Sequence, residues 1–357
     1  MPRSKFTSAA ITGIVTCVPT QERCIDDDID LFGGNTAQIA RIKSTIGLDR
    51  RRVAPAGVTA LDLCERAARE LIATCGSDAL DGLIFVTQTP DHFQPGNAAI
   101  LHGRLGLPEA CAAFDVALGC SGYVYGLWLA HQMVAAGGCS RVLLLAGDTM
   151  SRCVNARDRA VAPLFGDAGS ATVIERAAGS KAFFSLNTDG SGARSIIMPA
   201  GAFRERPNAG SKQEEVDAAG NVRCREDLSM DGGEVFNFSI RVEPRAVQEI
   251  CDFAGVAMSD VDHFIFHQAN RYIITNIVRR LKVPMEKAPA DTVSRFGNQS
   301  SASIPCTICD ALAGPLMVEK RRLVLSGFGV GLSWGTALLE IGPLSSCRIV
   351  NFSSQTL

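Results

Sequence analysis

Three short segments of the sequence each place a chemically reactive side chain among small residues. They offer a thiol at Cys120, an imidazole at His267 and a carboxamide at Asn298. A thiol can hold an acyl group as a thioester, and an imidazole with a carboxamide can polarise the thioester carbonyl of a second substrate. The three side chains together predict an enzyme that forms carbon–carbon bonds between acyl thioesters.

Each residue also has a simpler interpretation when it is taken alone. Cys120 can be a small buried thiol in a tight turn, and His267 can be a hydrogen-bonded core histidine. Two features favour the functional interpretation. Cys120 stands where a strand is expected to give way to a helix, and His267 ends an apolar strand and is followed by Gln268 and Asn270. The other four histidines lack such a setting and are expected to be structural or solvated, namely His92, His102, His131 and His263.

The segment after Cys120 predicts the element that positions the thiol. Residues 121–136 are apolar nearly all round, which is typical of a helix buried in the middle of a molecule. A cysteine at the start of a helix feels the positive end of the helix dipole, so we expect a lowered thiol pKa. Gly119 and Gly122 allow the sharp turn into this helix.

The sequence contains an internal duplication. Residues 80–86 resemble residues 261–267, and residues 141–145 resemble residues 322–326, and both matches have the same offset along the chain. The apolar runs predict strands buried on both faces of a sheet. We therefore expect two similar halves that alternate strands with helices, with two helix N-termini meeting near the axis that relates them.

Composition excludes several classes of protein. The chain has 357 residues, 46% of them hydrophobic, and a net charge of -2, so it lacks the basic character of a nucleic-acid-binding protein. No apolar run approaches the roughly 18 residues that span a membrane. The run over residues 9–15 reads as a buried strand and not as a signal peptide. The 13 scattered cysteines favour free thiols, and hence a cytoplasmic location.

Two further segments have competing interpretations. Cys306 and Cys309 have the spacing of a redox or zinc half-site, but no second pair lies near them in the sequence, which favours a buried helix after Pro305. Residues 201–225 are polar and contain four arginines. They are interpreted as a solvated surface loop, with a lid or a docking site for an acidic partner as the alternative.

At these residues the chain resembles the β-ketoacyl-acyl-carrier-protein synthase III family of the thiolase-like superfamily. The resemblance implies an α/β fold in which duplicated βαβαβ halves form a five-layered α-β-α-β-α stack. Residues 1–177 would form one half with Cys120, and residues 178–357 the other with His267 and Asn298. The landmarks are Phe114-Asp115-Val116, Gly119-Cys120-Ser121-Gly122, Phe165-Gly166-Asp167-Ala168-Gly169, Met230-Asp231-Gly232, His267-Gln268-Ala269-Asn270, Gly297-Asn298 and Phe328-Gly329-Val330-Gly331.

The resemblance implies a role for each site residue. Cys120 would take an acyl group from a primer thioester, with an oxyanion hole formed by its own N–H and that of Val330, beside Gly329. His267 and Asn298 would hydrogen-bond the thioester carbonyl of malonyl-carrier protein and stabilise the enolate left when carbon dioxide departs. The resulting carbanion would attack the acyl-Cys120 carbonyl. The expected partners are acyl carrier protein and an acyl-CoA or acyl-carrier primer, with no metal or other cofactor.

The chain departs from the family where coenzyme A is usually held. Arg41 stands in place of a tryptophan that stacks on the adenine, Thr45 in place of a phosphate-binding arginine, and Tyr272 in place of another arginine. Arg159 does match the family, and Asn270 belongs to the matched histidine motif. The reactive residues are thus retained while the residues expected to bind the nucleotide of coenzyme A are changed. This predicts a specialised relative whose primer arrives on a carrier protein.

Family members are homodimers, and Phe93 matches a residue that reaches into the partner's acyl pocket; by itself it can equally be a core aromatic. Two alternatives to a condensing enzyme remain. One is a non-condensing acyltransferase of the same fold that makes an ester or amide on a small molecule. The other is a catalytically silent partner subunit. The presence of Cys120, His267 and Asn298 favours condensation, and residues 328–334 lack the second cysteine of a thiolase.

Overall fold

Two β-sheets form the frame of the protein. The computed structural model describes residues 2–76 and 80–353. The six-stranded sheet has the order β17 (Cys347–Phe352), β2 (Ala9–Pro19), β8 (Ala168–Arg176), β7 (Arg141–Asp148), β5 (Gly82–Val86) and β6 (Ala112–Val116). The five-stranded sheet has the order β1 (Arg3–Phe6), β9 (Ala182–Thr188), β16 (Ser333–Ile341), β15 (Arg321–Gly329) and β14 (His263–Phe266).

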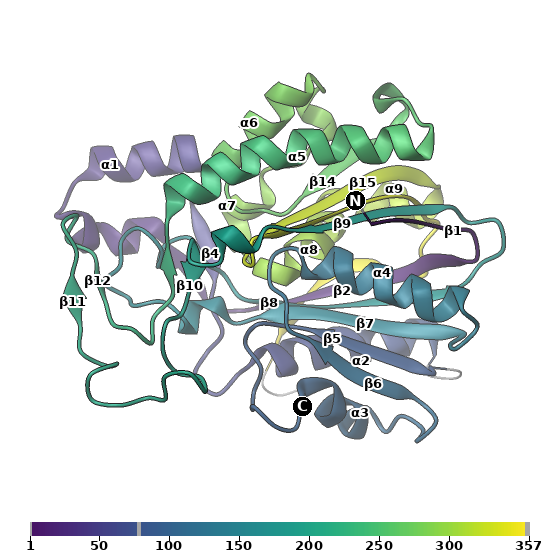
Figure 1. The fold of residues 1–357 in the computed structure, drawn as a ribbon, viewed down its shortest axis with the longest axis horizontal. Helices are drawn as coiled ribbons and strands as arrows, with labels where there is room; N and C mark the ends of the chain where they lie inside the picture. Colours follow the sequence, from purple (N-terminus) through teal and green to yellow (C-terminus); the bar gives the residue numbers. More distant parts are fainter. Residues whose placement is uncertain (1, 77–79, 354–357) are drawn as a thin grey trace.

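Helices cover both sheets and separate them. The outer face of the six-stranded sheet packs against α2 (Ala60–Cys75) and α3 (Asn97–Leu105), and that of the five-stranded sheet against α5 (Gly232–Ala254). Helix α6 (Arg271–Leu281) packs against α5 and shares a hydrophobic core with this sheet. Between the sheets, α4 (Gly122–Ala135) and α8 (Ser303–Ala311) contact strands of both. The predicted five-layered α-β-α-β-α stack is therefore confirmed (Figure 1).

Shorter elements complete the chain. The helices are η1 (Ile25–Phe32), α1 (Thr36–Arg41), η2 (Ile42–Ile46), η3 (Met150–Arg152), η4 (Gly190–Gly192), η5 (Met258–Asp260), η6 (Met285–Lys287), α7 (Thr292–Phe296), η7 (Ser300–Ala302) and α9 (Ala313–Val318). Three short antiparallel pairs join β3 (Glu22–Cys24) to β4 (Arg50–Arg52), β10 (Ile196–Ile197) to β13 (Ser229–Met230), and β11 (Glu215–Val216) to β12 (Val222–Arg223).

The predicted duplication is visible in the strand register. β5 pairs with β7 in parallel with Gly82 opposite Val142, and β14 pairs with β15 in parallel with His263 opposite Leu323. His263 follows Gly82, and Leu323 follows Val142, by the same number of residues. This number is the offset between the duplicated segments of the sequence. The paired strands of the two halves therefore correspond residue for residue.

The terminal strands are exchanged between the halves. The chain changes sheet between β8 and β9, close to the predicted division after residue 177. However, β1 pairs with β9 in the sheet of the second half, and β17 pairs with β2 in the sheet of the first. The division into two domains stays a prediction, and each sheet needs a strand from the other half of the chain.

Helix α4 is buried as its composition predicts. Tyr123, Val124 and Leu127 are fully buried, and each such apolar side chain stabilises the fold by about 1.5–3 kcal/mol. Gly126 lets the helix approach the sheet, because a Cβ at this position would lie 2.6 Å from the Leu144 side chain. Helix α4 is thus packed between the two sheets. This packing fixes the position of Cys120, which lies just before the helix.

Other expectations about local structure are also confirmed. Residues 9–15 lie in strand β2, and Cys306 and Cys309 are buried free thiols of helix α8. The segment 201–225 is mainly irregular, but it includes the β11–β12 pair, and its charges are partly neutralised from within. Arg223 pairs with Asp217 and Arg225 with Glu205. Among the residues that the structure describes, no helix has the length and apolar character needed to cross a membrane.

One buried carboxyl group lies outside the predicted site. Glu243 on α5 is fully buried, and one of its oxygens accepts a hydrogen bond from the Ser326 hydroxyl at 2.6 Å. The other oxygen finds no hydrogen-bond partner among the described residues. Burial therefore raises the pKa of Glu243 from 4.5 to about 8.

This raised pKa makes stability depend on pH. Between about pH 4.5 and 8 the unfolded chain has lost the Glu243 proton while the folded chain keeps it, so the free energy of unfolding falls as pH rises through this window. Glu243→Gln should remove this loss and stabilise the protein at pH 8 by on the order of 4 kcal/mol, with little effect at pH 4.5. Urea unfolding at several pH values measures this, with exposed Glu286→Gln as control. Parallel pH profiles for wild type and Glu243→Gln would contradict it.

Candidate active site

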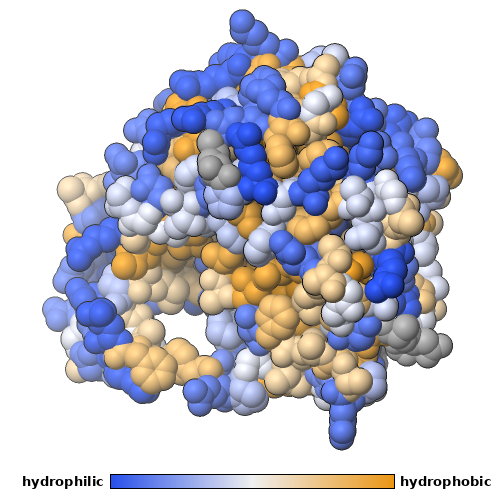
Figure 2. Space-filling model, turned by 45° about the vertical axis from the view of Figure 1, so that its right-hand side comes forward, coloured by the Kyte–Doolittle hydropathy of each residue, from blue (hydrophilic) through white to orange (hydrophobic). Residues whose placement is uncertain are grey.

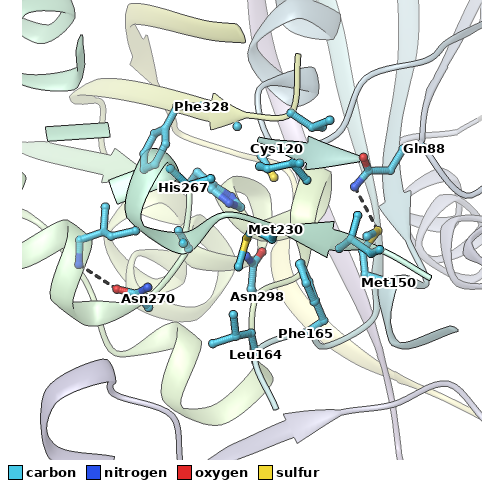
Figure 3. A pocket seen from close by; sticks show the side chains of 18 residues that line it. Gln88, Cys120, Met150, Leu164, Phe165, Met230, His267, Asn270, Asn298 and Phe328 are labelled. Carbon is cyan, nitrogen blue, oxygen red and sulfur yellow. Dashed lines mark hydrogen bonds between the residues drawn. The ribbon is translucent and has the colours of Figure 1, made fainter. Parts of the chain in front are cut away.

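A small cavity opens where the two central helices begin. Its volume is about 80 Å³, and its walls include Cys120, His267 and Asn298. Cys120 precedes α4, His267 follows β14, and Asn298 follows α7. Figure 3 shows the three side chains gathered around one space. The tertiary structure thus brings together the three residues that the sequence analysis selected.

The turn around Cys120 requires glycine. A Cβ at Gly122 would lie 2.4 Å from the Val86 side chain, and one at Gly329 would lie 2.9 Å from the Cys120 sulfur. The close approach of Gly329 directs the backbone N–H groups of Cys120 and Val330 toward the sulfur. These are the two donors predicted for an oxyanion hole, a role that stays a prediction.

The predicted lowering of the Cys120 pKa is wrong for this structure. Burial raises the pKa of the thiol to about 12, although the two N–H groups and Ser300 act in the opposite direction. An increase of this size corresponds to roughly 4 kcal/mol, whereas a helix terminus typically contributes 0.3–1 kcal/mol. Desolvation therefore wins, and the thiol is protonated at neutral pH.

His267 is held neutral by the same enclosure. Burial lowers the pKa of the imidazole to about 3. Its Nδ1 lies 2.7 Å from the Ser303 hydroxyl, and the ring also contacts the Ser300 backbone, which acts on the pKa in the direction opposite to burial. A hydroxyl can either donate or accept a hydrogen bond, so Ser303 supports both neutral tautomers. His267 can therefore present either a lone pair or an N–H on Nε2.

Asn298 is oriented by its own loop. Its Oδ1 accepts the N–H of Ser300 at 2.9 Å, so its Nδ2 remains as a donor for the cavity. The backbone of Asn298 is fixed on both sides, since its N–H donates to Leu164 and its carbonyl accepts from Gly166. The amide is thus presented as a hydrogen-bond donor before any substrate binds.

Three other predicted residues line the same cavity. Gly329, Val330 and Asn270 belong to its walls. The Asn270 side chain, however, accepts the N–H of Ile273 at 2.8 Å and caps the start of α6 (Figure 3). Its carboxamide oxygen is therefore used to begin a helix, and a role for Asn270 in binding substrate stays a prediction.

Phe93, Arg159 and Arg41 do not line the Cys120 cavity. Phe93 is 64% exposed, lies 5.4 Å from the Phe203 ring, and borders an outer groove. Arg159 donates to the carbonyl of Ala219. Arg41 lines a separate groove together with Thr45 and Tyr272. Their roles stay predictions. Figure 2 shows a hollow with hydrophobic side chains above and below it and more hydrophilic side chains at its sides.

The sequence analysis missed three polar residues around the thiol. Gln88 lines the cavity and also the outer groove, and Ser300 and Ser303 contact the thiol and the imidazole. Two signals could have identified them. The offset of the duplication places Ser301 opposite Cys120, and Gln88 follows the strand that matches the one before His267.

The five-layered stack and the thiol before its central helix define a protein of thiolase-like fold. Residues 114–192 match the sequence profile of 3-oxoacyl-[acyl-carrier-protein (ACP)] synthase III, and residues 251–341 match that of its C-terminal part. A crystal structure of a 3-oxoacyl-(acyl-carrier protein) synthase from Burkholderia xenovorans LB400 is similar, with a TM-score of 0.92 and 38% identity. That match covers 98% of this chain and 99% of that chain.

Two curated relatives extend this comparison. A protein of Campylobacter jejuni assigned as a 3-oxoacyl-[acyl-carrier-protein] synthase 3 is 35% identical over 356 residues, 99% of each chain. The β-ketoacyl-[acyl-carrier-protein] synthase III 2 of Streptomyces coelicolor is 34% identical and covers 92% of each chain. The chain therefore belongs to the β-ketoacyl-[acyl-carrier-protein] synthase III family, which consists of condensing, acyl-transferring enzymes.

The raised pKa of Cys120 leads to a test that needs no substrate. Because only the thiolate is nucleophilic, alkylation of Cys120 by iodoacetamide should still accelerate beyond pH 9 and show no plateau near neutrality. Peptide mass spectrometry would measure the labelling rate at Cys120, with the partly exposed Cys24 as internal reference. A labelling rate that reaches its plateau by pH 7 would contradict the raised pKa and support the lowered Cys120 pKa that the sequence predicts.

Proposed function

We propose that this protein condenses an acyl primer with malonyl-acyl carrier protein and releases a β-ketoacyl thioester, in fatty-acid or specialised-metabolite synthesis. One observation carries the proposal. A protonated thiol, a neutral imidazole and a carboxamide with a free NH₂ group line one enclosed cavity. The thiol and the imidazole serve the loading half-reaction, and the imidazole and the carboxamide serve the condensing half-reaction.

In the loading step, His267 Nε2 takes the proton of the Cys120 thiol, and the thiolate attacks the carbonyl carbon of the primer thioester. The N–H groups of Cys120 and Val330 stabilise the oxyanion. The bond between that carbon and the donor sulfur then breaks, and the donor thiol leaves with the proton from His267. The acyl group remains on Cys120 as a thioester.

In the condensation step, His267 presents the other tautomer, with the proton on Nε2. This N–H and the Nδ2 of Asn298 donate to the thioester oxygen of malonyl-carrier protein, so the enolate is stabilised as carbon dioxide leaves. The carbanion attacks the acyl-Cys120 carbonyl, the carbon–sulfur bond breaks, and the Cys120 thiolate takes up one proton. Ser303 supports this change of tautomer because its hydroxyl serves both states.

The proposed partners follow from the same reaction. Acyl carrier protein delivers the malonyl group, and the primer arrives on a carrier protein, since Arg41, Thr45 and Tyr272 replace the family's coenzyme A contacts. The reaction needs no metal or redox cofactor because the thioester itself makes the carbanion accessible. We place the enzyme in the cytoplasm, where these substrates occur.

The proposed assembly is a homodimer. At one edge of the six-stranded sheet lies β6, with Phe114 38% exposed, and Phe93 is exposed nearby in the chain. An open strand edge with exposed aromatic residues favours pairing with a second copy. Such a dimer would let Phe93 reach the partner, as the family resemblance implies.

A non-condensing acyltransferase is the alternative. It would need a base to activate an alcohol or an amine, and it would not need an amide donor beside the imidazole. The free Nδ2 of Asn298 favours condensation. A catalytically silent subunit is disfavoured because thiol, imidazole and carboxamide are all present and buried together.

The proposed function is tested by incubating the protein with acyl thioesters and then with malonyl-carrier protein. Wild type should gain the mass of the acyl group and then release a β-ketoacyl product, whereas Cys120→Ala should do neither while remaining folded. Supplying the primer on coenzyme A, on pantetheine and on carrier protein tests the carrier preference. Acyl mass gained by Cys120→Ala, or transfer to a small alcohol without decarboxylation, would contradict the proposal.

Asn298→Asp separates the two half-reactions. The aspartate keeps an oxygen that accepts the Ser300 N–H but replaces the NH₂ donor with a second oxygen. Decarboxylation of malonyl-carrier protein should fall by on the order of 10²–10³, while acyl loading on Cys120 persists. Labelled carbon dioxide release and intact mass report the two steps. An equal loss of both would count against the role of Asn298.

A further inference from the structure

Ser300 has an unusual backbone conformation directly beside the nucleophile. It lies at the start of η7, is fully buried, and has a φ of 50°. A non-glycine residue in this left-handed region costs of order 1 kcal/mol or more, and such strain gathers at functional sites. Glycine would relieve the strain, so the side chain needs an explanation.

The Ser300 hydroxyl lies near three polar groups, one of which is the Asp148 carboxyl group. It accepts a hydrogen bond from Gln88 Nε2 at 2.9 Å, and it lies 3.9 Å from the Cys120 sulfur. The 3.9 Å separation is long, as is common in unliganded sites, where such contacts tighten only during reaction. Because the Gln88 amide donates to the hydroxyl oxygen, the hydroxyl hydrogen has two acceptors within reach, the Asp148 carboxyl group and the Cys120 sulfur.

Gln88 is itself held across the turn before Cys120. Its backbone N–H donates to Asp148 Oδ1 at 2.8 Å, and its Nε2 also lies 3.0 Å from the Met150 sulfur (Figure 3). A Cβ at Gly119 would lie 2.6 Å from the Gln88 carboxamide oxygen. The absence of a side chain at Gly119 therefore lets the Gln88 amide reach Ser300.

We propose that Ser300 is a further catalytic residue, which donates a hydrogen bond to the Cys120 thiolate, and that Gln88 is the positioning residue that orients its hydroxyl. The proposal extends the loading half of the proposed function. It assigns Ser300 no direct part in enolate formation, where the donors are His267 and Asn298.

The thiolate needs such a donor because of its surroundings. The ionisable groups that face it are His267, which is neutral, and the buried carboxyl group of Asp148, whose charge opposes a second negative charge nearby. The backbone N–H groups of Cys120 and Val330 are its other donors. A hydrogen bond from a hydroxyl to a charged acceptor is stronger than one to a neutral acceptor, so its effect appears mainly when the thiolate forms.

The pH dependence of Cys120 alkylation by iodoacetamide tests this proposal. Ser300→Gly removes the hydroxyl and accepts the left-handed backbone without strain. We expect alkylation about tenfold slower at a fixed pH near 9, which equals about 1.4 kcal/mol, and a pH profile displaced upward. Gln88→Leu keeps the size of the side chain but not the donor, and it should displace the profile in the same direction by less. Ser170→Ala removes a distant buried hydroxyl and serves as control.

A second measurement excludes a merely structural effect. The N–H of Ser300 orients Asn298, so a distorted loop would also slow decarboxylation. Malonyl-carrier protein decarboxylation should therefore be equal in Cys120→Ala and in Cys120→Ala with Ser300→Gly. An unchanged alkylation profile in Ser300→Gly, or a decarboxylation loss in the double variant, would overturn the proposal. Alkylation needs no acyl substrate. The test of Ser300 can therefore succeed or fail independently of whether the protein catalyses the proposed condensation.

Discussion

The site depends on one buried carboxylate that joins the two halves of the chain. Asp148, at the end of β7, is fully buried, and one of its oxygens accepts from the Thr87 hydroxyl at 3.0 Å and the Gln88 N–H at 2.8 Å. The other oxygen accepts from the Ser301 N–H and hydroxyl at 3.1 and 2.7 Å. A buried carboxyl group is tolerated only when its oxygens are satisfied. These bonds therefore hold the loop after β5 and the start of η7 in one arrangement.

Enclosure of the cavity decides how its groups are protonated. The same loss of water raises the pKa of Cys120 and lowers that of His267, so the resting pair is a neutral thiol and a neutral imidazole. The helix dipole acts on Cys120 in the opposite direction but is too weak to compensate. Charge is created only when a proton moves between the two, and fixed donors already surround the place where it appears.

The structure separates the reactive side chains from the grooves whose residues are predicted to bind substrate. The three reactive side chains lie in a cavity of about 80 Å³, while Arg41 and Phe93 border two wider and more exposed grooves. The two central helices and the sheets hold the cavity, whereas loops and short helices form the grooves. Exposed loop positions tolerate substitution more readily than a packed core does. This accounts for the prediction that the chain keeps the family's reactive groups while it departs from the family at Arg41, Thr45 and Tyr272.

The sequence by itself determined the duplication, the buried strands and helices, and the three reactive residues, because these depend on local patterns that repeat along the chain. The register of β14 on β15 repeats that of β5 on β7 at the offset of the duplication. Only the tertiary structure decided the exchange of β1 and β17, the contact of Gln88 with Ser300 across a wide separation in the chain, and the sign of the Cys120 pKa shift. Desolvation and long-range hydrogen bonds depend on which residues, far apart in the sequence, come together in the fold and exclude water. No local sequence pattern encodes these contacts.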